Sequence, residues 1–129
     1  MRPRHTPDPA ATRRLGQRGE QIAQRYLESQ GYAIERTNVR YPVGELDIVA
    51  WEGATLCFIE VRSTTSSQWG GPLASIDWRK RRRMIRAAQW YLNQRTLPPE
   101  IRFDVLAIEW NGGRPPAIEL IRGAFDTSS

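Results

Sequence analysis

Hydrophobic residues recur along the chain with two different spacings, and the change between them predicts where helices and strands lie. Over residues 13–30 they return about every 3.6 positions, which predicts an amphipathic helix with Thr12 as its N-cap and Gly31 just after its end. Residues 77–94 repeat this spacing until Leu97-Pro98-Pro99, where consecutive prolines prevent a helix from continuing. The pattern therefore predicts two helices that are far apart in the sequence.

Five further segments carry alternating or densely β-branched residues between turn-forming residues, which is typical of strands. They are residues 32–40, 45–51, 55–62, 101–110 and 117–121. Residues 63–72 are polar and glycine-rich, and they are predicted to form a loop. The order α-β-β-β-α-β-β predicts the α/β class, with a mixed β-sheet flanked by helices.

The length of 129 residues suits a single domain, because two separate cores would each bury too little apolar surface. Residues 1–12 contain three prolines and no periodic apolar positions, so they are predicted to form a flexible basic tail. The domain is expected to span residues 13–122, and residues 123–129 are expected to form a flexible C-terminal tail.

The charge balance points to a polyanionic partner. Lys and Arg together number 19 against 14 acidic residues, which gives a net charge of +5. Lys80 is the only lysine, and arginine offers a planar fork that matches phosphate. A GC-rich genome also favours arginine codons, so the arginine bias alone does not decide the partner, whereas the net charge favours nucleic acid.

Several classes of protein are excluded by composition. No apolar run approaches the roughly 18 residues that a membrane-spanning helix needs, and the N-terminal residues lack the apolar core of a secretory signal. Cys57 is the only cysteine and lies in an apolar run, so it is predicted to be a buried thiol. These features predict a cytoplasmic protein with no membrane partner.

The two strands between Glu45 and Arg62 carry the main chemical signal. If they are joined by a two-residue turn at Gly53-Ala54, Asp47 lies opposite Glu60 and Glu45 lies opposite Arg62. All four side chains would then project from one side of the sheet, because residues i and i+2 of a strand share a face.

Two carboxylates directly opposite each other are destabilising, and Glu60 also lies within the apolar run Leu-Cys-Phe-Ile-Glu-Val. An unpaired buried carboxylate costs several kcal/mol, so something must offset it. Arg62 could do so as a structural ion-pair partner. A divalent cation, Mg²⁺ or Mn²⁺, could do so as a ligand of both carboxylates. The spacing leaves both explanations open.

The second predicted helix adds cations near this hairpin. Lys80 falls near the inward face of the helix, Arg81 is a rival on the other side of that face, and both could instead extend to solvent. A run of charges is most often a solvated face, but consecutive cations at a helix start oppose the helix dipole, which adds weight to a phosphate-binding role. The candidate nucleic-acid-binding residues are Arg79, Arg81, Arg82, Arg83 and Arg86, with Trp78 and Trp90 interleaved.

Seven short motifs together resemble the YraN-like family of bacterial proteins. They are Gly19-Glu20, Gly31-Tyr32, Asn38-Val39-Arg40, Gly-Glu-Leu-Asp-Ile-Val at 44–49, Phe-Ile-Glu-Val-Arg at 58–62, Arg79-Lys80, and Arg-Phe-Asp-Val at 102–105. The resemblance covers about residues 13–122. Through this family the chain resembles the restriction-endonuclease-like PD-(D/E)XK superfamily, in the layout of archaeal Holliday-junction resolvases.

The resemblance implies catalytic roles at matching positions. Asp47 and Glu60 would bind Mg²⁺ or Mn²⁺, and Glu20 would match a glutamate of the first helix that helps to hold metal or water. The implied reaction is metal-assisted hydrolysis of phosphodiesters in structured DNA. Resolvase-like proteins act as dimers, which implies that this chain could form a homodimer.

One position departs from the superfamily pattern, because Arg62 stands where the catalytic lysine is expected. Arginine can stabilise developing negative charge but does not give up its proton. Lys80 matches a lysine of the family and could supply the missing cation. Two alternatives to an endonuclease-like enzyme therefore stay open: a non-catalytic nucleic-acid-binding module of the same fold, and a structural or adaptor protein.

Overall fold

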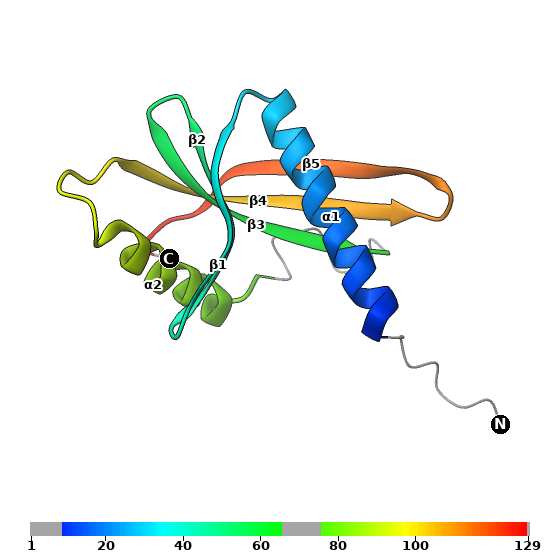
Figure 1. The fold of residues 1–129 in the computed structure, drawn as a ribbon, viewed down its shortest axis with the longest axis horizontal. Coiled ribbons are helices and arrows are strands. Elements are labelled where there is room, and N and C mark those ends of the chain that lie inside the picture. The colour runs from blue at the N-terminus through cyan, green and yellow to red at the C-terminus, as the bar shows by residue number, and fades with distance from the viewer. Residues whose placement is uncertain (1–8, 66–75, 129) are drawn as a thin grey trace.

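The computed structural model describes residues 9–65 and 76–128, and its elements follow the predicted order (Figure 1). They are α1 (Pro9–Ser29), β1 (Ala33–Tyr41), β2 (Gly44–Glu52), β3 (Thr55–Thr64), α2 (Trp78–Leu92), β4 (Glu100–Asn111) and β5 (Arg114–Phe125). The mixed sheet flanked by two helices confirms the predicted fold class. Within the described residues, neither helix is long and apolar enough to cross a membrane.

The helix and the strand next to the two predicted tails extend further than expected, so the predicted inner boundaries of both tails are wrong. Helix α1 begins at Pro9, so residues 9–12 are helical and Thr12 is not the N-cap. Proline suits the first turn of a helix, where its missing N–H has no intrahelical acceptor to lose. Strand β5 continues to Phe125, which pairs with Phe103 on β4 and stacks on its ring at 4.9 Å. Residues 1–8 of the N-terminal tail and residues 66–72 of the loop predicted at 63–72 lie outside the described residues, whereas Ser63 and Thr64 belong to β3.

The sheet has five strands in the order β1-β2-β3-β4-β5. Strands β3 and β4 pair in parallel, and the other neighbours are antiparallel. A parallel pair needs a crossover connection, and α2 lies within it. Helix α2 begins beside the middle of β3, where Lys80 of the helix lies 3.1 Å from Glu60 of the strand.

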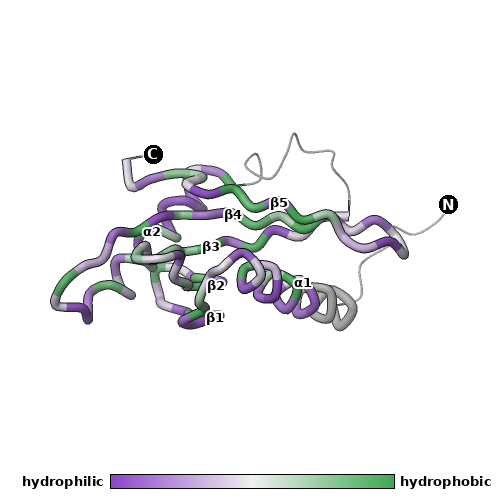
Figure 2. Tube along the Cα trace, turned by 90° about the horizontal axis from the view of Figure 1, so that it is seen from above, coloured by the Kyte–Doolittle hydropathy of each residue, from purple (hydrophilic) through white to green (hydrophobic). Residues whose placement is uncertain are grey.

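The two faces of the sheet bury separate apolar clusters. Leu56 and Phe58 of β3 pack with Met84 of α2, whereas Cys57 and Ile59 pack with Leu27 of α1. Figure 1 shows α1 crossing the strands and the tip of the β1–β2 hairpin lying beside α2. In Figure 2 hydrophobic stretches run along the central strands, which both clusters share. Burial raises the pKa of the Cys57 thiol to about 12, which confirms the predicted buried cysteine.

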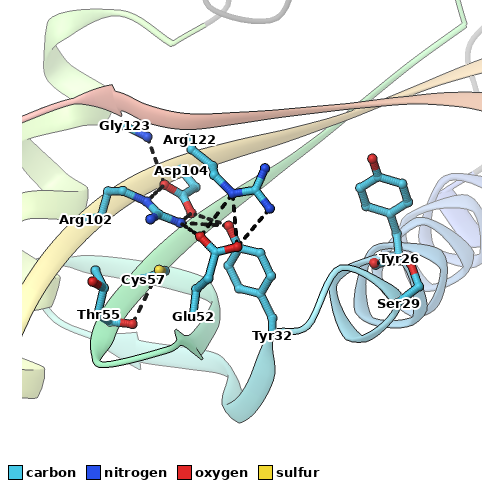
Figure 3. Close-up of polar contacts among 10 residues, drawn as sticks. All are labelled: Tyr26, Ser29, Tyr32, Glu52, Thr55, Cys57, Arg102, Asp104, Arg122 and Gly123. Atoms are coloured by element: carbon cyan, nitrogen blue, oxygen red, sulfur yellow. Dashed lines mark hydrogen bonds and ion pairs between the residues drawn. The ribbon is translucent and has the colours of Figure 1, made fainter.

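A partly buried network of ion pairs and hydrogen bonds lies at the sheet near the C-terminal end of α1 (Figure 3). Asp104 is fully buried and accepts hydrogen bonds from Arg102 Nε (2.7 Å) and from the hydroxyl of Tyr32 (2.9 Å). The backbone N–H of Gly123 donates to the same carboxylate at 3.0 Å. Arg102 also bonds to Glu52, to which Arg122 donates in turn. The network therefore joins the connection between α1 and β1 to β2, β4 and β5, and burial beside Asp104 raises the pKa of Tyr32.

We expect Asp104→Asn to lower the free energy of unfolding by about 3 kcal/mol, because the change leaves the Arg102 guanidinium without its main counter-charge. Urea denaturation measures the change. Glu119→Ala, which removes an exposed carboxylate from β5, is the matched control and should change stability by no more than about 0.5 kcal/mol. Equal stabilities for the two variants would show that the network contributes little.

Candidate functional site

The turn between β2 and β3 has the predicted length. Glu52 pairs with Thr55, which leaves Gly53 and Ala54 as the turn residues. The ladder between the two strands continues in the predicted register as far as Ile48 opposite Ile59, where the paired residues end. Asp47 and Glu60 are the next residues beyond this last pair.

The side chain of Asp47 explains why the ladder stops there. Its Oδ2 accepts the backbone N–H of Val61 at 2.9 Å, in the place where a carbonyl of β2 would otherwise accept it. A buried backbone N–H needs an acceptor, so this carboxylate satisfies a polar group that the separation of the strands would have left unpaired. The Asp47 side chain is thereby fixed between β2 and β3.

The prediction that Glu45 projects from the same side of the sheet as Asp47 and Glu60 is wrong. Residues three apart in a regular strand face opposite sides of the sheet, yet Leu46 and Val49 both pack in the cluster under α2. The alternation of sides is therefore interrupted between them, at Asp47. A Cβ on Gly44 would lie 2.6 Å from the carbonyl oxygen of Arg83, which shows that Gly44 also faces α2 and that Glu45 faces away. The cause is a matching irregularity on β1, where Asn38 has a φ of 52° and lies opposite Asp47 between two regular pairs.

Glu60 lies on the α2 side of the sheet, next to Asp47 and Lys80. It is only 3% exposed, and its Oε1 lies 3.1 Å from Lys80 Nζ and 3.8 Å from an Arg62 nitrogen. Its Oε2 is buried and has no hydrogen-bond partner among the described residues. Burial and the neighbouring Asp47 carboxylate raise the pKa of Glu60 to about 7, although Lys80 acts in the opposite direction.

Helix α2 supplies Lys80 from its first turn. Asp77 is the N-cap, and its side chain accepts the backbone N–H of Lys80 at 2.9 Å. The lysine side chain then turns inward onto Glu60, as the helical spacing predicted. Arg81 does not compete for the carboxylates, because its Nε donates to the carbonyl of Ile76 and its guanidinium lies over the ring of Phe125.

Glu20 lies apart from this pair but is linked to it. Its Oε2 accepts a hydrogen bond from the side-chain nitrogen of Asn38 at 3.1 Å, and Asn38 is the register partner of Asp47. In residues 9–65 and 76–128, no three His, Cys, Asp or Glu side chains are placed to hold one metal ion together. The structure thus brings Asp47 and Glu60 together, whereas Glu20 is connected to this pair only through Asn38.

The chemistry of these donors still fits Mg²⁺. This cation commonly binds through one or two carboxylates and completes its shell with water and substrate phosphate. The Asp47–Glu60 pair, with its unpartnered buried Oε2, provides two such carboxylates. A cation there would also remove the repulsion that raises the pKa of Glu60.

The other predicted nucleic-acid-binding residues lie on the outside of α2. Arg79, Arg82, Arg83 and Arg86 are exposed, whereas Arg81 is partly buried. The sequence interpretation missed a role for Asn38, although it stands in one of the quoted motifs. Its signal is an asparagine inside a strand, since asparagine tolerates a positive φ better than other residues with a side chain.

Comparison with known proteins shows the family of this chain. The model of the uncharacterised protein family UPF0102 matches residues 19–108, which include Glu20, Asp47, Glu60, Arg62 and Lys80. The chain belongs to the UPF0102 family, also called the YraN family. The resemblance inferred from the sequence motifs is therefore confirmed at the family level.

Similar UPF0102 proteins occur in distant bacteria. A UPF0102 protein of Moorella thermoacetica is 46% identical over 116 residues, which cover 88% of this chain and 96% of the relative. One from Desulfosudis oleivorans is 43% identical over 114 residues, covering 88% and 90%. One from Myxococcus xanthus is 40% identical over 119 residues, covering 92% and 94%. The similarity thus extends over nearly the whole of each protein.

The raised pKa of Glu60 predicts how stability depends on pH in this UPF0102 protein. The folded chain keeps the Glu60 proton up to about pH 7, whereas the unfolded chain loses it near 4.5. The folded state therefore binds more protons in this window, and the free energy of unfolding should fall as the pH rises, by on the order of 3 kcal/mol. Urea denaturation at several pH values in EDTA measures this slope.

Glu60→Gln should flatten the pH dependence, because the amide does not titrate. Glu45→Gln is the matched control on β2, since Glu45 is exposed and faces away from α2, and it should keep the wild-type slope. A slope that survives in Glu60→Gln would assign the titration to another group.

Proposed function

We propose that this protein is a Mg²⁺-dependent, endonuclease-like enzyme that hydrolyses phosphodiesters in structured DNA. The observation that carries the proposal is the buried Glu60 carboxylate, which lies against Asp47 and keeps one oxygen without a partner. Such an arrangement costs stability in a metal-free protein, and a divalent cation between the two carboxylates would offset that cost.

The order of these residues along the hairpin supports the PD-(D/E)XK resemblance. An aspartate stands where β2 separates from β3, and a glutamate follows on β3 two residues before a cation, Arg62. Lys80 approaches the same glutamate from the neighbouring helix. The site therefore has two acidic ligands and two basic side chains on contiguous elements.

Mg²⁺ bound at this pair would polarise a phosphoryl oxygen and lower the pKa of an attacking water. The Val61 N–H holds the Asp47 carboxylate in place for this role. Lys80, at 3.1 Å from Glu60, would place a positive charge beside a phosphate bound at this pair and would stabilise the negative charge that develops on it. Arg62, at 3.8 Å from Glu60, would add a second positive charge there.

A non-catalytic nucleic-acid-binding module is the second candidate. Lys80 already neutralises one oxygen of Glu60, and Glu20 bonds to Asn38. An internal ion pair of this kind could replace the metal, while the exposed arginines of α2 keep their affinity for phosphate. Cleavage and binding must therefore be measured separately.

Cleavage of branched, flapped and linear DNA with Mg²⁺ or Mn²⁺ tests the proposal. Wild-type protein should cleave at least one of these substrates, and Glu60→Gln and Asp47→Asn should each lose about 10²-fold or more. Glu45→Gln is the control and should cleave normally. Mn²⁺ should raise the Tm of the wild type and of Glu45→Gln but not that of Glu60→Gln. If wild type and Glu60→Gln are equally inactive while DNA binding persists, the binding module is correct.

The two cations near Glu60 should contribute unequally. Lys80 is closer to the carboxylate than Arg62, so we expect Lys80→Ala to lower kcat about 10²-fold and Arg62→Ala to lower it less. Arg62→Lys should retain activity, because an ammonium group is a compact charge in the same position. Single-turnover kinetics compare the variants, and the reverse order would make Arg62 the stabilising cation.

A further inference from the structure

Helix α2 presents a continuous row of exposed side chains that the proposed active site does not use. At 100° per residue, Arg79, Arg83, Arg86 and Trp90 fall within about 60° of one another, and we call them the α2 stripe. All four are exposed. They point away from Met84 and Ala88, which are buried residues of the same helix.

The α2 stripe lies on the side of the helix that faces β1 and the start of β2. Gly44 packs against the backbone of Arg83, and the ring of Trp90 lies 5.5 Å from the ring of Tyr41. The tip of the β1–β2 hairpin beside α2 is visible in Figure 1. Trp90 nevertheless remains 48% exposed, so Tyr41 supports the indole ring without covering it.

A polar groove of about 480 Å³ continues from Tyr41 along β1. Its lining residues are Arg36, Asn38, Val39, Arg40, Tyr41, Tyr91, Gln94 and Arg95. We call it the β1 groove. It contains three arginines and no carboxylate, although Arg95 is paired with Glu35 at 2.7 Å and Arg40 with Glu45 at 3.8 Å. Asn38, at one position of this lining, is also the residue that bonds to Glu20.

The geometry points to a binding path for a single nucleic-acid strand, formed by the α2 stripe and the β1 groove, with an unpaired base stacked on Trp90. The inference deepens the proposed function and rests on it, since it names the form of the substrate that reaches Asp47 and Glu60. The arginines complement the charge of the phosphate backbone, and the exposed indole offers a face to a base.

An exposed tryptophan between cations favours a single strand over a duplex. In a duplex the faces of the bases are covered by their neighbours, and only base edges and phosphates are accessible to a protein surface. A single strand exposes base faces, and stacking on aromatic side chains is the usual way in which proteins bind it. Structured DNA with an unpaired flap or a frayed branch would supply such a strand.

The same helix connects this path to the carboxylate pair. Lys80, next to Arg79 in the first turn, reaches inward to Glu60, while Arg79 begins the exposed stripe. A strand lying along the α2 stripe would therefore run toward the Asp47–Glu60 pair at the N-terminal end of the helix.

Fluorescence anisotropy with a labelled oligothymidine and a hairpin duplex of equal charge tests the inference, in EDTA so that no cleavage occurs. Wild-type protein should bind the single strand more tightly than the duplex. Trp90→Ala should weaken single-strand binding about tenfold or more and duplex binding much less, whereas Trp90→Phe should retain most of the affinity. Trp90 is half exposed, so neither substitution should unfold the protein. Circular dichroism checks that both variants stay folded.

Trp78→Ala is the matched control. Trp78 is 61% exposed on the same helix, lies outside the α2 stripe and carries Arg79 over its ring, so its removal should change affinity less than about twofold. Arg83→Ala and Arg86→Ala should each reduce the salt slope of single-strand binding by about 0.7, and Arg25→Ala on α1 should leave it unchanged.

Equal losses in Trp90→Ala and Trp78→Ala would overturn the inference, as would equal losses for single strand and duplex. Glu60→Gln separates this result from the proposed function, because it should bind the single strand as wild type does. If Glu60→Gln also cleaves DNA normally, the proposed function fails while the strand path stands. If cleavage needs Glu60 but Trp90→Ala binds normally, the path fails while the function stands.

Discussion

The structure around the proposed active site depends on one unfavourable contact, the burial of Glu60 beside Asp47. Lys80 compensates one oxygen of Glu60, and the other has no partner among the described residues. A chain selected only for stability would place an apolar residue there, since replacing buried charges by well-packed hydrophobic groups is often neutral or stabilising. Local violations of this kind are expected at functional sites, where a ligand supplies the missing compensation.

A second buried carboxylate in the same sheet shows that the fold can satisfy such a group completely. Asp104 receives hydrogen bonds from Arg102, from the Tyr32 hydroxyl and from the Gly123 backbone, so both of its oxygens have donors (Figure 3). Glu60 has an equally buried position on the neighbouring strand but lacks such a set. The contrast assigns a stabilising role to Asp104 and leaves Glu60 as the carboxylate that has capacity for a ligand.

Local patterns predicted the element order and the Gly53–Ala54 turn, because spacing and turn residues act over short stretches of chain. The juxtaposition of Asp47 and Glu60 followed from that turn by counting. The face of Glu45 could not be predicted, since it depends on the positive φ of Asn38 on another strand. The Tyr32–Asp104 bond could not be predicted either, because it joins the connection after α1 to β4, and these residues meet only in the folded chain. Helix α1 begins earlier than the spacing of apolar residues predicts, because Pro9 suits the first turn of a helix although it lies in a proline-rich segment.

Gly44 couples the two proposed functional surfaces of α2. Its missing side chain lets the hairpin tip approach the helix so closely that a Cβ would meet the Arg83 carbonyl oxygen at 2.6 Å. That close contact, together with the packing of Met84, Ala87 and Ala88 in the apolar cluster, holds the helix against the sheet in one orientation. One rotation then serves two purposes, because it turns Lys80 inward onto Glu60 and sets Trp90 against Tyr41 at the edge of the sheet. A larger residue at position 44 would displace α2 from β2 and disturb the cation at the carboxylates and the aromatic pair together. The close approach at Gly44 is therefore a constraint on packing that also bears on both proposed sites.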